Sequence, residues 1–289
     1  MPNTTFTPIT SRANPLIVES AKLAADRKYR ESAHLFCFEG KKLLSEALDA
    51  GVPLERVFAA DTAVLRYRAL LDRLSCPVYQ VSDAVYEKLS AEKSPEGLFS
   101  VAKYLDNLIF PHTIYMKRSH FPTIIDSTDV ENGWERILVC DGLQDPGNLG
   151  TVLRTANALG FDRVVLSKNS ADIYHPKTLR GAMGALFRIP VDLAEDICAY
   201  IGSLKEAGYA VYAAALSDGA QPLPSLSVSE RTVFVIGNEG HGLSSAVISA
   251  CSGSVIIPMA EGAESLNAAV AAALLMWERA KVPSHDRES

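Results

Sequence analysis

Residues 137–160 read ILVCDGLQDPGNLGTVLRTANALG, and this stretch predicts a buried strand, a turn and a helix in direct succession. The apolar run at 137–140 is typical of a strand that is covered on both faces of a sheet. Pro146 and Gly147 follow as turn residues. Asn148 suits the N-cap of the next helix, because its side chain can accept a backbone N–H of the first turn. A strand that leads through a short loop into a helix is the repeating unit of a parallel sheet.

The helix that follows Asn148 has an apolar face and a charged position opposite to it. At about 100° per residue, the apolar face is formed by Leu149, Val152, Leu153, Ala156 and Leu159. Arg154 falls roughly opposite that face, so its guanidinium does not reach the core of its own unit. An ordinary solvated arginine and an arginine aimed at a substrate or a second subunit both fit this position, and the spacing alone favours the former.

A second loop follows the apolar run at 233–236 and reads Gly237-Asn238-Glu239-Gly240-His241-Gly242. Glycines let a backbone approach a ligand closely, although a glycine-rich turn by itself is a weak signal. The spacing matches neither G-x-G-x-x-G nor a Walker A loop. Glu239 would repel a pyrophosphate, so the loop favours a ligand without phosphates or one with a positive centre. His241 has no orienting partner in the sequence, and we expect it to be a spectator.

A third loop follows the apolar residues 255–257. Pro258 ends the strand, and Ser265 is placed to cap a long helix that starts at Leu266. Asn267 then lies in the first turn, where its amide could bond a ligand or only the local backbone. In open α/β sheets, ligands bind beyond the carboxyl ends of the strands, so three such loops on one sheet predict a site there.

The chain divides into three segments that differ in their pattern of apolar and polar residues. Residues 136–289 alternate apolar strands with amphipathic helices, which predicts a parallel sheet. Residues 1–104 predict a small α/β unit, and residues 105–135, with two prolines and no periodicity, predict a linker with an insertion. The elements expected in the first unit are helices at 15–30, 41–50 and 85–89 and strands at 34–38, 57–59 and 77–79.

Composition limits the function classes. The 289 residues carry a net charge of −6, which argues against a basic surface over the whole protein but not against a local basic patch. The most basic stretch lies within residues 1–42, with seven Lys and Arg against four Asp and Glu; it includes Lys22, Arg27, Lys28 and Arg30. A solvated helix face and a nucleic-acid contact are equally good explanations of it.

Cysteine and histidine usage favours a cytoplasmic protein without a metal. The five cysteines are dispersed and form no C-x-x-C pair, which argues against a zinc ribbon or a disulfide framework and fits a reducing cytosol. The six histidines show no metal-ligand spacing. The N-terminus lacks the pattern of a signal peptide, and no apolar run is long enough to span a membrane.

Taken together, the three loops resemble the three motifs of the SpoU (TrmH-type) RNA ribose 2′-O-methyltransferases, within the SPOUT superfamily. The matching residues are Asp145-Pro146-Gly147-Asn148-Leu149-Gly150 with Arg154, then Gly237-Asn238-Glu239-Gly240 with Gly242-Leu243-Ser244, then Ile257-Pro258-Met259 with Ser265-Leu266-Asn267. Residues 178–191 also resemble the family, except that Ala182 stands where a serine is common. The match covers about 145 residues.

The first unit resembles, more loosely, the L30e-like substrate-binding domain that is often fused to such enzymes. The similar pieces are Phe38-Glu39-Gly40-Lys41 and Ser94-Pro95-Glu96-Gly97-Leu98. The insertion at 105–135 departs from the family's usual short linker. The implied fold is therefore α/β, with an L30e-like domain at 1–104 and a parallel-sheet SPOUT domain with a deep trefoil knot at 136–289.

The resemblance also implies a chemistry and a set of site residues. S-adenosylmethionine would donate a methyl group to a ribose 2′-hydroxyl of RNA, with ribosomal RNA favoured over tRNA. Arg154 would act as base, activator or phosphate anchor, and Asn148, Glu239, Ser265 and Asn267 would position the ribose and shape the loops. The implied cofactor contacts are Gly237, Asn238, Ile257, Met259 and Leu266.

Because Arg154 points away from its own core, a homodimer with the site near the interface is expected. Two alternatives remain open: the same chemistry on tRNA, and a non-catalytic RNA-binding protein that kept the knot. A nucleotide-binding oxidoreductase is disfavoured by the missing G-x-G-x-x-G.

Overall fold

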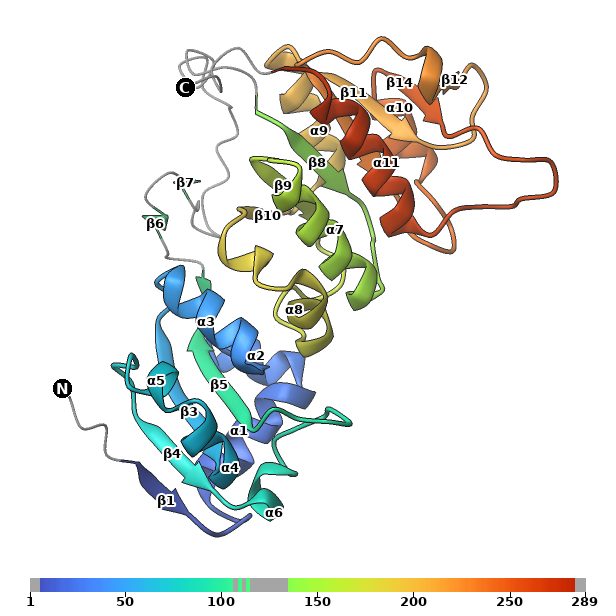
Figure 1. Cartoon of the computed structure of the whole chain (residues 1–289). Helices are drawn as coiled ribbons and strands as arrows, with labels where there is room; N and C mark the ends of the chain where they lie inside the picture. The colour runs from blue at the N-terminus through green and yellow to red at the C-terminus, as the bar shows by residue number, and fades with distance from the viewer. Residues whose placement is uncertain (1–5, 106–108, 111–112, 115–134, 284–289) are drawn as a thin grey trace.

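The computed structural model describes residues 6–105, 109–110, 113–114 and 135–283, which form two α/β units joined side by side (Figure 1). The first unit is built on a five-stranded sheet in the order β1-β4-β3-β5-β2. Its strands are β1 (Thr7–Ile9), β2 (Leu35–Glu39), β3 (Leu54–Ala60), β4 (Val78–Val81) and β5 (Leu98–Lys103). The sheet is mixed, because β1, β4 and β3 are parallel while β5 runs antiparallel to both β3 and β2.

Six helices accompany this first sheet: α1 (Pro15–Ala25), α2 (Arg27–Ala33), α3 (Lys41–Asp49), α4 (Asp61–Arg66), α5 (Arg68–Leu71) and α6 (Asp83–Tyr86). The prediction of a single helix over 15–30 is wrong. Asp26 ends α1 in an extended conformation, and its side chain then caps α2 by accepting a hydrogen bond from the Tyr29 backbone at 3.1 Å. A capping aspartate therefore interrupts a stretch that has helical periodicity on both sides.

The second unit is built on a seven-stranded, wholly parallel sheet in the order β10-β9-β8-β13-β11-β14-β12. Its strands are β8 (Ile137–Cys140), β9 (Arg163–Ser167), β10 (Val191–Ala194), β11 (Ala210–Ala214), β12 (Gln221–Pro222), β13 (Thr232–Ile236) and β14 (Gly253–Ile256). The five strands expected here are all present, although β14 ends at Ile256 rather than at Ile257. The strands β10 and β12 were not predicted.

Helices cover both faces of the second sheet (Figure 1). They are α7 (Pro146–Ala158), α8 (Pro176–Ala182), α9 (Ile197–Glu206), α10 (Ser245–Ala250) and α11 (Ala268–Ala280), with short 3₁₀ turns η3 (Ala185–Phe187) and η4 (Leu223–Ser225). Leu138 and Cys140 of β8 pack in the core that contains α7 and α11. Ile137 and Val139 pack in a second core with α9 and α10. Burial on both faces explains why these strands are continuous apolar runs.

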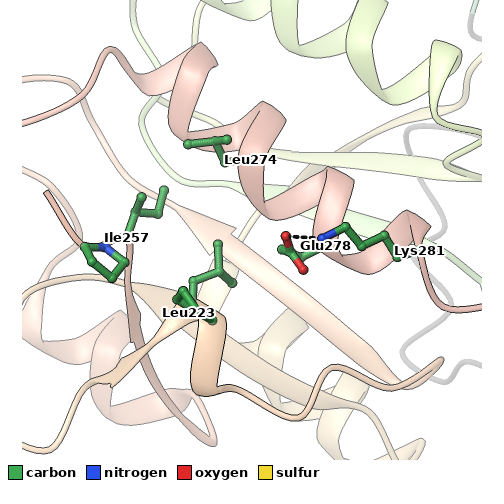
Figure 2. Close-up of a pocket in the computed structure, with 7 residues that line it drawn as sticks. Leu223, Ile257, Leu274, Glu278 and Lys281 are labelled. Carbon is green, nitrogen blue, oxygen red and sulfur yellow. Dashed lines mark hydrogen bonds and ion pairs between the residues drawn. The ribbon is translucent and has the colours of Figure 1, made fainter.

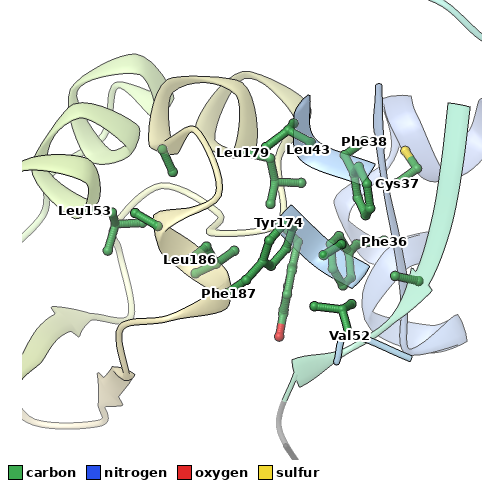
Figure 3. Packing of buried hydrophobic residues seen from close by; sticks show 14 of the residues in the cluster. Phe36, Cys37, Phe38, Leu43, Val52, Leu153, Tyr174, Leu179, Leu186 and Phe187 are labelled. Atoms are coloured by element: carbon green, nitrogen blue, oxygen red, sulfur yellow. The ribbon is translucent and has the colours of Figure 1, made fainter. Parts of the chain in front are cut away.

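The core on the α7 face continues into the first unit (Figure 3). Phe36 and Phe38 of β2 lie against Tyr174 and Phe187 of the second unit, with ring centroids 4.7 Å and 5.6 Å apart respectively. α8 lies between β2 and α7. The two units therefore share buried apolar surface, rather than being tethered only by the segment between them.

Most of the predicted linker at 105–135 lies outside the described residues. Of the rest, Leu105 is buried, and two short strands, β6 (Ile109–Phe110) and β7 (Thr113–Ile114), pair antiparallel. No helix among the described residues has both the length and the apolar character needed to cross a bilayer.

Candidate active site

Three loops meet beyond the carboxyl ends of the second sheet. The first follows β8, the second follows β13 and the third joins β14 to α11. β8 and β13 are hydrogen-bonded neighbours, so their loops start side by side. The third loop reaches them through the hydrogen bond from Asn267 to Asn148, so the predicted convergence of the three motif loops is observed.

A chain of hydrogen bonds joins one side chain from each loop. Glu239 Oε1 accepts from Asn148 Nδ2 at 3.0 Å, and Asn148 Oδ1 accepts from Asn267 Nδ2 at 3.0 Å. The Glu239 carboxylate also accepts backbone N–H groups from Gln144 and Asp145, both at 3.1 Å. Both ends of the Asn148 amide are thus used to brace the second and third loops against the first.

These hydrogen bonds set the charge state of Glu239. Its partial burial would raise the pKa of the carboxyl group. The hydrogen bond from Asn148 and the backbone N–H bonds outweigh that effect and hold the pKa of Glu239 below its ordinary value. Glu239 is therefore an anion at neutral pH, with its oxygens occupied by donors from its own chain.

The two predicted helix caps are wrong, each by a few residues. The N-cap of α7 is Asp145, whose Oδ1 accepts the Asn148 backbone N–H at 2.8 Å. Asp145 also receives Lys177 Nζ at 2.8 Å, and this ammonium, together with the Asn148 N–H, lowers the pKa of Asp145. Asn148 lies one turn further in, so its side chain is free to reach the other loops.

The N-cap of α11 is Asn267 rather than Ser265, and the helix begins at Ala268 rather than at Leu266. Asn267 Oδ1 accepts the backbone N–H groups of Ala269 and Val270, while its Nδ2 donates to Asn148. One amide thus caps a helix and fixes a loop. Ser265 is exposed in the loop before the helix.

The second loop is a tight backbone turn. Asn238 and Gly242 exchange two backbone hydrogen bonds, at 3.1 Å and 3.0 Å. The Asn238 side chain donates to the Gly142 carbonyl at 2.8 Å and accepts from the N–H groups of Gly240 and His241. A Cβ atom at Gly237 would lie 2.4 Å from the Gly242 carbonyl carbon, so only glycine fits there.

Arg154 lies on α7 and is exposed, on the side away from the buried residues of that helix, as its position in the sequence predicted. Among the described residues, its guanidinium has no hydrogen bond or ion pair with another side chain. His241 contributes a backbone N–H to the second loop and is itself exposed.

Apolar side chains remain uncovered where β11 and β14 end. Met259 and Leu266 of the third loop are each 38% exposed, and Leu216, two residues past β11, is 80% exposed. β11 and β14 are paired strands, so these loops leave the same edge of the sheet. Leu216 was missed in the sequence, where its signal is a single large apolar residue directly after a buried strand.

A cavity of about 450 Å³ opens beside the third loop, between its first residues and α11 (Figure 2). Its lining residues are Leu223, Pro224, Ile257, Pro258, Leu274, Glu278 and Lys281. The lining is largely apolar, and its two charged residues pair with each other, Lys281 Nζ lying 2.6 Å from Glu278 Oε1. Of the predicted cofactor residues, only Ile257 belongs to this lining.

Comparison with known proteins adds independent information. Residues 135–277 match the model of the SpoU rRNA Methylase family, and residues 14–100 match that of the MRM3-like substrate binding domain. The chain is also 32% identical to the 23S rRNA (guanosine(2553)-2′-O)-methyltransferase RlmP of Bacillus subtilis, over 93% of this chain and 97% of that protein. The chain belongs to the SpoU rRNA methylase family.

Solved structures of SpoU-type enzymes agree with this assignment. The AdoMet-bound rRNA methyltransferase of Sinorhizobium meliloti is 26% identical, with a TM-score of 0.77 over 96% of this chain and 98% of that one. A structure described as an RNA 2′-O ribose methyltransferase is 30% identical, with a TM-score of 0.75 over 95% and 98%. The predictions of a SpoU-family RNA methyltransferase and of S-adenosylmethionine as its cofactor are thereby confirmed.

The residues at the strand ends fit this cofactor. Its adenosyl group needs apolar surface and backbone polar groups, and Leu216, Met259 and Leu266 supply uncovered apolar surface beside an irregular loop. S-adenosylmethionine carries a positive sulfonium and no phosphate, which is compatible with the ionised Glu239 close by. Among the described residues, no group of three side chains could hold a metal ion.

Proposed function

We propose that this SpoU-family enzyme methylates a ribose 2′-hydroxyl of ribosomal RNA in the cytoplasm. The observation that carries the proposal is the Glu239–Asn148–Asn267 chain of hydrogen bonds, which joins the three motif loops to the first turn of α7, the helix that also carries the exposed Arg154. The full-length similarity to a 23S rRNA enzyme supports ribosomal RNA over tRNA. The match of residues 14–100 to a substrate-binding domain supports RNA recognition by the first unit.

When bound, S-adenosylmethionine supplies an electrophilic methyl group for in-line displacement by the ribose oxygen. As the C–O bond forms and the C–S bond of the sulfonium breaks, the 2′-hydroxyl proton would pass to solvent water. Arg154 is a fixed positive charge on a rigid helix, free of internal partners among the described residues. It therefore stabilises the developing negative charge on the oxygen, or holds the adjacent RNA phosphate so that the hydroxyl is aligned.

The remaining predicted residues position the loops, the cofactor and the ribose, and they take no part in proton transfer. The amides of Asn148 and Asn267 are hydrogen-bonded to each other, and Asn148 also donates to Glu239. These bonds hold the loops in a preorganised shape. Gly237 and Asn238 give the second loop its tight turn. Ile257, Met259 and Leu266, with Leu216, contact the cofactor, and Ser265 lines the loop on the ribose side.

We also propose a homodimer formed through α11. Val270, Leu274 and Trp277 are 49%, 40% and 53% exposed and follow one another at helical spacing along one face. An apolar stripe of this kind is a typical partner surface. Light scattering at micromolar concentration should give twice the chain mass for the native protein and a lower mass for Trp277→Glu.

The strand order supports the knotted topology expected of the family. β13 follows β11 in the chain but lies between β8 and β11, and β14 then pairs on the far side of β11. α11 returns from there to pack near α7. The domain limits 1–104 and 136–289, and an L30e-like fold for the first unit, are part of the same proposal.

The deciding experiment is a map of 2′-O-methyl groups in RNA from cells with and without the gene. It is combined with methylation of unmodified ribosomal RNA by the purified protein and S-adenosylmethionine. A missing methyl group in ribosomal RNA that the protein restores supports the proposal. A missing group in tRNA establishes the tRNA alternative. Cofactor binding with no change in any RNA would indicate a non-catalytic RNA-binding protein.

A further inference from the structure

Arg30, which the sequence placed in a basic surface stretch, is buried where the two units meet. Only 1% of the residue is exposed. Its Nε and Nη2 atoms donate to Asp172 Oδ2 at 3.1 Å and 2.7 Å, across the junction. Its Nη1 donates to the carbonyl oxygens of Leu23 and Ala24, in the last turn of α1. All three guanidinium nitrogens are therefore used, and they join α1, α2 and the second unit.

Asp172 is fixed in turn to the start of α8. Its Oδ1 accepts the Tyr174 backbone N–H at 2.9 Å, and its carbonyl accepts the Thr178 hydroxyl at 2.9 Å and the His175 N–H at 3.1 Å. The Asp172 side chain is 12% exposed. The carboxylate thus transmits the position of Arg30 to the first turn of α8 through short contacts.

α8 is packed backbone to backbone on α7, the helix that carries Asn148 and Arg154. A Cβ atom at Gly150 would lie 2.5 Å from the Thr178 carbonyl oxygen and 2.9 Å from the Ala182 nitrogen. Helices in such close contact cannot slide or rotate freely on each other. Arg30 is therefore connected to α7 through short, tightly packed contacts by way of Asp172 and α8.

The rest of the junction is mainly apolar, and two more ion pairs cross it, Arg180 with Glu92 and Arg188 with Glu46. Both of those arginines are about half exposed, so Arg30–Asp172 is the most buried of the three pairs. Phe36, Phe38, Tyr174 and Phe187 supply the adhesive surface (Figure 3). The hydrophobic effect is non-directional, whereas a guanidinium on a carboxylate has a defined geometry. A buried ion pair adds little net stability compared with apolar side chains, so its contribution lies in specifying one arrangement.

We infer that the Arg30–Asp172 pair is a positioning device for RNA. It fixes the substrate-binding unit relative to α7, so that RNA held by the first unit presents one ribose to Arg154. This inference rests on the proposed function, because it assumes that the first unit binds the RNA substrate. Arg30 and Asp172 are positioning residues, since neither touches the reacting atoms.

The test replaces both partners with apolar residues of similar size, Arg30→Met with Asp172→Leu, which leaves no uncompensated charge in the junction. The matched control is Arg56→Met with Glu19→Leu. Arg56 is also buried and lies 2.8 Å from Glu19, but this pair joins β3 to α1 within the first unit. Both double variants therefore remove the carboxylate pair of one buried arginine of the first unit, but only the Arg30–Asp172 pair crosses the junction.

We expect the Arg30/Asp172 variant to raise the KM for RNA about tenfold. Its kcat at saturating RNA and its Kd for S-adenosylmethionine should stay within about twofold of native, and methylation should spread to neighbouring riboses. The Arg56/Glu19 control should keep the native KM and the native site. Equal KM values for the two variants, or a native KM and site in the Arg30/Asp172 variant, would overturn the inference.

A second measurement does not depend on turnover. Spin labels at Thr62 on α4 and Glu206 on α9, two exposed positions in different units, report the distribution of interdomain distances. Labels attached through a ketone-bearing residue leave the native cysteines unmodified. The distribution should be narrow in the native protein and in the control, and broad in the Arg30/Asp172 variant. If the native protein methylates no RNA, the proposed function fails, and an unchanged distribution still refutes the positioning role.

Discussion

Asn148 and Asn267 are 119 positions apart in the chain, yet their side-chain amides are joined by a hydrogen bond of 3.0 Å. The same Asn148 amide donates to Glu239, and the same Asn267 amide caps α11. A single asparagine side chain therefore couples the shape of the second loop to the start of the C-terminal helix. This coupling leads to the first prediction.

Asn148→Ala should lower kcat/KM for RNA by about 10- to 100-fold, because the loops lose their brace while Arg154 is untouched. The cost in stability should be only about 1 kcal/mol, since these bonds lie at the surface. The matched control is Asn157→Ala on the same helix, which should keep native kinetics. Steady-state methylation assays and urea unfolding measure both effects. Native kinetics in Asn148→Ala would contradict the brace.

Glu239→Gln tests the lowered pKa of Glu239. The carboxylate accepts three hydrogen bonds, but it is exposed, so solvent screens them. The substitution should therefore lower the free energy of unfolding by about 1 kcal/mol at neutral pH. Because the folded-state pKa lies below the unfolded value, this contribution is fully present above the unfolded pKa. It is lost as the pH falls through the folded pKa.

Urea unfolding of native protein and Glu239→Gln should therefore give a constant stability difference above about pH 5.5, shrinking toward pH 3. A difference that grows on acidification would mean that the Glu239 pKa is raised in the folded protein.

Arg154→Ala should lower turnover by about 10²- to 10⁴-fold at saturating RNA and leave the Kd for S-adenosylmethionine nearly unchanged. Arg154→Lys should recover little, because a compact ammonium does not reproduce a planar guanidinium. Single-turnover methylation separates the two proposed roles. Normal turnover of Arg154→Ala at saturating RNA would make Arg154 a phosphate anchor without a role at the ribose oxygen.

Neutralising Lys22, Arg27 and Lys28 together should weaken RNA binding and reduce its dependence on salt, with kcat little changed. All three are exposed, in contrast to Arg30, which is therefore left out of this set. Binding titrations at several salt concentrations give the slope of log K against log salt. An unchanged slope would show that RNA contacts the first unit elsewhere.

Gly150→Ala should destabilise the fold by about 1–3 kcal/mol, because the added methyl group collides with the backbone of α8. Gly202→Ala on α9 is the matched control. A Cβ atom there meets nothing within 4 Å, so the change should stabilise the protein by about 0.5–1 kcal/mol through helix propensity. Urea unfolding measures both. A neutral Gly150→Ala would argue against a rigid contact between α7 and α8.

The sequence was most informative where the signal is local and strong. The runs at 137–140 and 210–214 are continuous apolar segments, and they are strands with those bounds. The motif loops could be placed because each follows such a strand. Arg154 could be placed on the exposed face because helical periodicity alone determines it.

The predictions failed where several residues compete for one role. Asp145 and Asn148 are both good caps within one turn, and Ser265 and Asn267 likewise, so only tertiary contacts decide between them. β12 is two residues long and carries no periodic signal. The Arg30–Asp172 pair spans 142 positions, and nothing near Arg30 in the sequence distinguishes it from the exposed Arg27 and Lys28.

The core shared by Phe36, Phe38, Tyr174 and Phe187 has a consequence for heat denaturation. Neither unit can melt without exposing aromatic surface of the other, so the two should lose structure in one calorimetric transition. For the same reason, a gene rearrangement that exchanged the first unit for another RNA-binding module would have to supply a matching apolar face. The two units look like separate modules in the sequence, but in this chain we expect them to fold and unfold together.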